Sequence, residues 1–116
     1  MRPGREPLLS DGFFVHVVDD GDGSSVVVSG ELDLTTCEAL QQHVTVLVDP
    51  RKTVTIDLRD VTFMDSTGLR ALWTIHQNLL SSGGHLRLTS PSESVRRVLE
   101  VTRLEGIFDI GPDGSP

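Results

Sequence analysis

Aromatic residues and cysteine are scarce in this sequence. Four phenylalanines, one tryptophan and no tyrosine occur among 116 residues, so the core must be built mainly from aliphatic side chains. A surface this poor in tyrosine and tryptophan is a weak candidate for stacking on bases or sugars. Cys37 is the single cysteine, which excludes a disulfide within the chain and is typical of a cytoplasmic protein.

Positive charge is also in short supply. Ten Lys and Arg residues stand against 17 Asp and Glu residues, for a formal net charge of −7. The basic residues are scattered, and their adjacent pairs, Arg51–Lys52 and Arg96–Arg97, fall in an expected turn and on an expected helix. Because an acidic surface without a basic stripe repels phosphate backbones and anionic headgroups, we expect no direct binding to nucleic acid or membrane.

Long apolar runs are missing as well. No uninterrupted apolar stretch approaches the roughly 20 residues that a helix needs to cross a bilayer. The N-terminal sequence MRPGREPLLSDG contains arginine but no apolar run of signal-peptide length. We therefore expect a cytoplasmic protein.

The short motifs that carry common chemistries do not occur. The sequence has no GxGxxG, GxxxxGK[ST], HExxH or CxxC, and its four histidines show no ligand spacing. Ser66 follows Asp65 at an expected strand-to-helix turn, but the residues around it do not form the GxSxG pattern of serine hydrolases. The sequence therefore predicts no catalytic residue, no metal and no cofactor.

The middle of the chain alternates between β-rich runs and helical stretches. We predict one domain over residues 12–111, a disordered lead-in at 1–11 and a flexible tail at 112–116. The predicted strands cover 13–18, 25–29, 54–58, 85–89 and 107–110, and the predicted helices cover 35–48, 66–82 and 92–101. A hairpin followed by repeated strand–helix units predicts an α/β fold, with a mostly parallel sheet of about five strands and three helices.

Local patterns make sharper predictions. Thr35 with Glu38 three residues later is a capping box, which predicts the start of the first helix. The valine run at 26–28 is typical of a strand covered on both faces, and Gly83–Gly84 predicts the end of the second helix. Helical spacing predicts two buried stripes, which consist of Cys37, Leu40, Val44, Leu47 and Val48 in the first helix, and of Leu69, Leu72, Trp73, His76, Leu79 and Leu80 in the second.

Two polar segments fall at the carboxyl ends of predicted strands, the edge at which α/β sheets bind ligands and partners. The first is Gly30–Asp33, with sequence GELD, and the second is Val61–Leu69, which links the third strand to the second helix. Both admit a purely structural interpretation. Asp33 can end a strand, and either Asp65 or Ser66 can cap a helix.

Together the two segments resemble the STAS family of anti-sigma-factor antagonists. The resemblance extends over about residues 13–110 and implies a right-handed β-α superhelix with helices packed on the sheet. The residues that carry it are GELD at 30–33, FMDSTGL at 63–69, Gly83–Gly84 before a Leu-Arg-Leu strand, Pro91, Val98–Leu99, and the ending formed by Leu104, Gly106 and Phe108.

The resemblance also implies a function. The unphosphorylated protein would bind an anti-sigma factor, itself a serine kinase, and so free a sigma factor. Phosphorylation of Ser66 would abolish binding until a serine phosphatase removed the phosphate. The implied partner-binding residues are Asp33, Asp65, Ser66, Thr67 and Gly68. The alternative is a STAS signalling or scaffold module that binds another protein or a small ligand.

Overall fold

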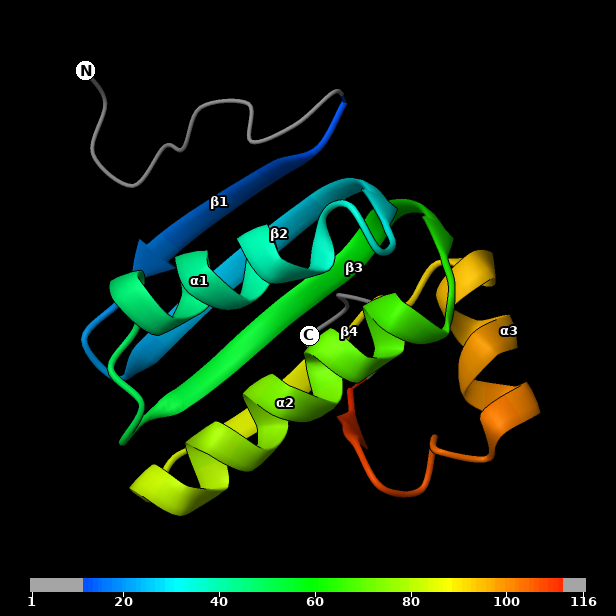
Figure 1. The fold of residues 1–116 in the computed structure, drawn as a ribbon. Helices are drawn as coiled ribbons and strands as arrows, with labels where there is room; N and C mark the ends of the chain where they lie inside the picture. The colour runs from blue at the N-terminus through cyan, green and yellow to red at the C-terminus, as the bar shows by residue number, and fades with distance from the viewer. Residues whose placement is uncertain (1–11, 112–116) are drawn as a thin grey trace.

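The computed structural model describes residues 12–111, so the predicted lead-in at 1–11 and the predicted tail at 112–116 lie outside the described residues. Eight elements follow one another in this range (Figure 1). The strands are β1 (Phe14–Asp19), β2 (Gly23–Leu32), β3 (Thr53–Met64), β4 (His85–Thr89) and β5 (Asp109–Ile110), and the helices are α1 (Cys37–Leu47), α2 (Ser66–Ser82) and α3 (Glu93–Thr102).

The strands form one sheet whose spatial order is the chain order, β1-β2-β3-β4-β5. β1 and β2 are an antiparallel hairpin, and every later strand pairs in parallel with the one before it. Helices α1 and α2 run side by side over one face of the sheet (Figure 1). The predicted fold class, a mostly parallel five-stranded α/β sheet with three helices, is confirmed.

Burial alternates along the strands because the helices cover one face. In β2, Val26 and Val28 are fully buried, whereas Val27 between them is only half-buried. In β4, Leu86 and Leu88 are buried and the intervening Arg87 is half-buried. The prediction that the valine run is covered on both faces is therefore wrong.

Helix α2 has the predicted bounds. Its end is closed by Gly83, in the left-handed region at φ 91°, and the Gly84 amide donates to the Leu79 carbonyl at 2.8 Å. The buried stripe differs from the prediction, because Trp73 and Leu80 are 36% and 50% exposed. Ala71 and Ile75 are buried instead, since α2 packs against α1 as well as the sheet.

Helix α1 starts two residues later than predicted, and the capping box does not form. The Thr36 hydroxyl donates to the Glu31 carbonyl at 2.7 Å and accepts from the Asp33 amide at 2.9 Å, so it holds the turn that enters the helix. Cys37, predicted to be buried, is half-buried, and its Sγ lies 3.6 Å from the Leu34 carbonyl oxygen. Leu47 is exposed as well.

An irregularity in the pairing of β2 with β3 sets how the sheet reaches the GELD motif, because Thr62 is an extra residue in β3 between the partners of Gly30 and Glu31. The register between β2 and β3 shifts between Gly30 and Glu31, and Gly30 adopts φ +107°. A Cβ on Gly30 would collide with the backbone carbonyl oxygen of Gly12. Only glycine adopts this φ without strain and also leaves room for the Gly12 carbonyl oxygen, which is a physical reason for the residue type at this position.

His76 lies in an aromatic cluster between α2 and the residues before β5. The centroid of its ring is 5.6 Å from that of Trp73 and 5.5 Å from that of Phe108. The residue is 9% exposed, and its Nδ1 atom has no hydrogen-bond partner in the described part of the chain. Burial, with a smaller effect from His85, lowers the pKa of His76 below its ordinary value of 6.5.

We expect the free energy of unfolding to fall as the pH drops below about 6.5, because the unfolded chain binds a proton that folded His76 resists. The stabilisation from neutral His76 is complete above the unfolded pKa and is lost as pH falls toward the lower folded pKa. Urea unfolding of the wild type and of His76→Phe at pH 7.5 and 5.5 measures the effect. The variant keeps a ring but cannot titrate, so an equal pH dependence in both proteins would contradict this expectation.

Candidate functional site

The two motif segments meet where β2 and β3 end together. Glu31 pairs with Phe63 and Leu32 with Met64, so Asp33 and Asp65 each follow directly on a paired residue. Sequence reasoning ends the third strand at residue 58 and treats the stretch up to Asp65 as a link. In the structure β3 continues to Met64, because β2 continues to Leu32 and supplies Phe63 and Met64 with partners. The candidate site is therefore anchored on the sheet.

Asp33 organises the turn between β2 and α1. Its Oδ1 atom accepts hydrogen bonds from the Thr35 amide at 3.0 Å and the Thr35 hydroxyl at 2.8 Å. Its carbonyl accepts from the Cys37 amide at 2.9 Å. The side chain is half-buried, so the structural interpretation of Asp33 holds in the fold.

Asp65 is the N-cap of α2. Its Oδ1 atom accepts from the amides of Thr67 and Gly68 at 3.0 and 3.1 Å and from the Thr67 hydroxyl at 2.5 Å. The hydroxyl contact has the largest effect, and together these hydrogen bonds hold the pKa of Asp65 below its ordinary value of 3.8 despite partial burial. Asp65 is therefore an anion at neutral pH, and it is the residue that caps the helix.

Ser66 is the first residue of α2, and its side chain is exposed. Because Asp65 performs the capping, the Ser66 hydroxyl makes no hydrogen bond with any residue of the described range 12–111. The structure does not support the interpretation in which Ser66 caps the helix. Ser66 is exposed to solvent.

The remaining predicted site residues are less accessible. Thr67 is half-buried, with its hydroxyl bound to Asp65. Gly68 is buried, and a Cβ there would collide with the Leu32 carbonyl oxygen and the Met64 side chain. Gly68 thus lets α2 approach the end of β2 closely, while contact between Gly68 and a partner stays a prediction.

Sequence reasoning missed two exposed apolar side chains beside the site. Leu34, directly after Asp33, is 73% exposed, and Phe63, two residues before Asp65, is 46% exposed. Each offers apolar area that a bound protein would remove from water. The inward position of Met64 implies an outward Phe63, but this signal exists only once β3 is known to extend that far.

The structure assigns the cap of α2 to Asp65 and not to Ser66, and stability measurements can check this assignment. We expect Asp65→Ala to lower the free energy of unfolding by about 1 kcal/mol, because two amides and a hydroxyl lose their acceptor. Ser66→Ala should leave it within about 0.5 kcal/mol of the wild type. Chemical denaturation of both variants measures the free energy of unfolding. A larger decrease in Ser66→Ala than in Asp65→Ala would assign the cap to Ser66.

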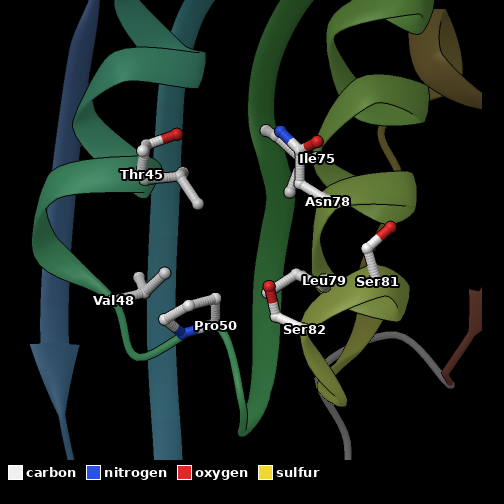
Figure 2. A pocket seen from close by; sticks show the side chains of 9 residues that line it. Thr45, Val48, Pro50, Ile75, Asn78, Leu79, Ser81 and Ser82 are labelled. Carbon is white, nitrogen blue, oxygen red and sulfur yellow. The ribbon is translucent and has the colours of Figure 1, made fainter.

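A hollow lies between the C-terminal turns of α1 and α2, at the ends of these helices away from Asp33 and Ser66 (Figure 2). Its volume is about 290 Å³, and it is lined by aliphatic side chains together with hydroxyl and amide groups. None of the described residues that line it is ionisable, so it suits an uncharged apolar group and offers no cation to a phosphate. The lining residues are Val44, Thr45, Val48, Pro50, Ile75, Asn78, Leu79, Ser81 and Ser82.

Residues 12–111 offer neither a metal centre nor a membrane-spanning helix. They contain no group of three or more His, Cys, Asp or Glu side chains placed to hold a metal ion. None of the helices in this range has the length and apolar character needed to cross a membrane.

Comparison with known proteins relates the chain to one family. The model of the STAS domain matches residues 17–114. The anti-sigma-B factor antagonist of Bacillus subtilis (strain 168) is 31% identical over 96 residues, which cover 83% of this chain and 88% of that protein.

Solved structures show the same fold. The crystal structure of an anti-sigma factor antagonist from Mycobacterium paratuberculosis superposes with a TM-score of 0.73 at 28% identity, covering 94% of this chain and 92% of that one. The Bacillus protein SpoIIAA, an anti-sigma factor antagonist, is alike in fold in two states. Its unphosphorylated form gives a TM-score of 0.67 at 22% identity, over 84% of this chain and 87% of that one. Its phosphorylated form gives 0.64 at 20% identity, over 87% and 92%.

Proposed function

The chain belongs to the STAS domain family, and from this premise we propose that it is an anti-sigma-factor antagonist. In its unphosphorylated form it binds an anti-sigma factor and so frees a sigma factor. The anti-sigma factor is a serine kinase that phosphorylates Ser66 from ATP, and a serine phosphatase reverses the modification. The protein catalyses no reaction itself and acts in the cytoplasm, without contacting nucleic acid or membrane.

The observation that carries the proposal is the unbonded, exposed hydroxyl of Ser66. A kinase needs a serine oxygen that it can reach, on a segment whose position is fixed. Asp65 fixes the position of this segment by capping α2, and the Ser66 hydroxyl makes no hydrogen bond within the described range 12–111. Phosphorylation can therefore act on binding without removing a hydrogen bond from the fold.

The charges around Ser66 support an electrostatic switch. A phosphate adds about −1.5 to −2 charges at neutral pH, next to an Asp65 side chain that is already ionised. Asp33 leaves the sheet from the neighbouring strand. A partner that binds this surface already contacts the carboxylates of Asp33 and Asp65, and after phosphorylation it would also have to contact the phosphate. An unpaired charge at an interface is strongly unfavourable.

The exposed apolar side chains supply the attractive part of the proposed interface. Leu34 and Phe63 flank the acidic residues and offer area that a partner can remove from water. We include both in the partner-binding surface together with Asp33, Asp65 and Ser66. Binding would then combine apolar burial at the flanks with a charge-sensitive centre.

A kinase assay tests the proposal. The chain is incubated with candidate anti-sigma kinases and ATP, and the modified residue is mapped by mass spectrometry. We expect phosphate on Ser66, none in Ser66→Ala, and full modification in Ser82→Ala, which changes the serine at the other end of the same helix. Modification of a different residue, or binding to none of the kinases, would contradict the proposal.

The alternative, a module that binds another protein or a small ligand, has its own structural support. The apolar hollow between the C-terminal turns of α1 and α2 could receive an uncharged molecule. This alternative predicts no phosphate transfer to Ser66, so the same kinase assay distinguishes the two functions.

A further inference from the structure

Arg70 is an exposed cation on α2, four residues after Ser66. Residues at this spacing lie on one face of a helix, and helical side chains lean toward the N-terminus, so a long side chain at position 70 reaches back toward position 66. Within the described residues Arg70 makes no hydrogen bond or ion pair. Arg51 and Arg97, by contrast, are paired with Asp49 and Glu93.

A phosphate on Ser66 would find two of the backbone donors at the start of α2 already occupied. Helix N-termini bind phosphate through their free backbone N–H groups. In α2 the amides of Thr67 and Gly68 both donate to Asp65 Oδ1, at 3.0 and 3.1 Å. The Asp65 carboxylate is an anion, so it repels the phosphate. It also occupies the Thr67 and Gly68 amides, which would otherwise donate to the phosphate oxygens.

We propose that Arg70 is the residue that binds the phosphate on Ser66 in the phosphorylated protein. This inference rests on the proposed phosphorylation of Ser66. The guanidinium presents several N–H donors in a planar fork that matches phosphate oxygens, and a charge-assisted pair of this kind is stronger than a neutral hydrogen bond. Arg70 thus takes the place of the amides that Asp65 occupies.

The contact gives the phosphorylated state a defined structure. With its phosphate held along α2, Ser66 presents a fixed anionic group at the surface that the unmodified protein offers to its partner. The positive charge of Arg70 becomes committed to the phosphate, so it is no longer available to a carboxylate of the partner. Phosphorylation therefore changes the availability of two side chains in one step.

The test uses full-length protein in which phosphoserine is incorporated at position 66 during translation, so that it needs no kinase. The second pKa of the phosphate is measured by ³¹P NMR titration in the otherwise wild-type chain, in Arg70→Gln, in Arg70→Lys and in Arg97→Gln. Arg97→Gln removes the same charge from an exposed position on α3 and is the matched control. Circular dichroism verifies that each variant is folded.

We expect Arg70→Gln to raise the second pKa of the phosphate by about 0.3–0.5 unit, because the dianion loses its counter-charge. Arg70→Lys should restore part of the shift, and Arg97→Gln should leave the phosphate pKa within about 0.1 unit of the reference protein, a change that salt screening would further reduce. The Arg70 Nε–H resonance should move on phosphorylation.

Equal phosphate pKa values in Arg70→Gln and Arg97→Gln, with an unmoved Arg70 Nε–H resonance, would overturn the inference. Because the phosphate is installed during translation, that result would leave the proposed function intact. Conversely, a failure of every kinase to modify Ser66 would count against the proposed function and would not alter the measurement of the phosphate contact.

Discussion

Phosphorylation of Ser66 should weaken binding to the anti-sigma partner about a thousandfold, whereas Ser66→Ala should bind as tightly as the wild type. A loss of about 4 kcal/mol corresponds to that factor, and it is within the range expected when a phosphate that a single guanidinium only partly neutralises is buried at an interface beside Asp65. Alanine adds no charge and removes a hydroxyl that has no structural partner in the described range. Ser66→Asp should have an intermediate effect, since it carries one charge and fewer acceptor oxygens than a phosphate.

Isothermal titration of the four proteins against the purified partner measures these affinities. Ser82→Asp is the matched control, because it adds the same charge at the far end of α2. It should bind with nearly wild-type affinity. If the phosphorylated protein and Ser66→Ala bound equally tightly, Ser66 would be an ordinary surface serine and the switch would lie elsewhere.

Gly30→Ala should lower the free energy of unfolding by about 3 kcal/mol, more than alanine at either Gly21 or Gly106, because two costs add at this position. Alanine is strained at φ +107°, at about 1–2 kcal/mol, and its Cβ would collide with the backbone oxygen of Gly12, at about 1–3 kcal/mol. Gly30 lies at the register shift after which Leu32 pairs with Met64, directly before Asp33 and Asp65, so we also expect weaker partner binding.

Two other glycines separate these costs. Gly21 has a positive φ of 89° but open space around it, so Gly21→Ala should cost only the strain, about 1 kcal/mol. Gly106 has neither a positive φ nor a neighbour within 4 Å of an added Cβ, so Gly106→Ala should be within about 0.5 kcal/mol of the wild type. Urea denaturation gives all three values, and similar losses at Gly30 and Gly21 would show that the collision with Gly12 is relieved.

Helix α2 could be predicted from the sequence because both of its ends are local. A good capping residue stands at its start, and a glycine that tolerates the left-handed region stands at its end. The start of α1 could not be predicted in the same way. Thr35 and Glu38 form a proper capping-box pattern, but the Thr35 hydroxyl donates to Asp33. The N-cap is Thr36, whose hydroxyl donates to the Glu31 carbonyl at the end of β2, a contact that the local pattern does not reveal.

The full length of β3 was missed for a similar reason. Residues Thr62–Met64 do not alternate clearly, and they belong to a strand because Glu31 and Leu32 of β2 pair with Phe63 and Met64 after the register shift at Thr62. The exposure of Trp73 and Leu80 depends on where α1 lies, which periodicity along α2 alone does not reveal.

In the candidate site, too, local sequence predicts some features, and others depend on the three-dimensional structure. Asp33, Asp65 and Ser66 were found from motifs and from the family resemblance, because their position after the strands is encoded locally. The sequence could not decide whether Asp65 or Ser66 caps α2, since both residue types suit the position. That decision depends on the direction of the Asp65 side chain, which the structure supplies.

The order of strands in the sheet also has a consequence for how the protein reaches its native state. Each strand pairs with the one before it in the chain, so no strand waits for a partner from the distant end of the sequence. Short sequence separation between paired segments lowers the entropy lost in closing each loop and favours rapid folding. During synthesis the β1–β2 hairpin can form first, and β3, β4 and β5 can then join the growing edge as they leave the ribosome.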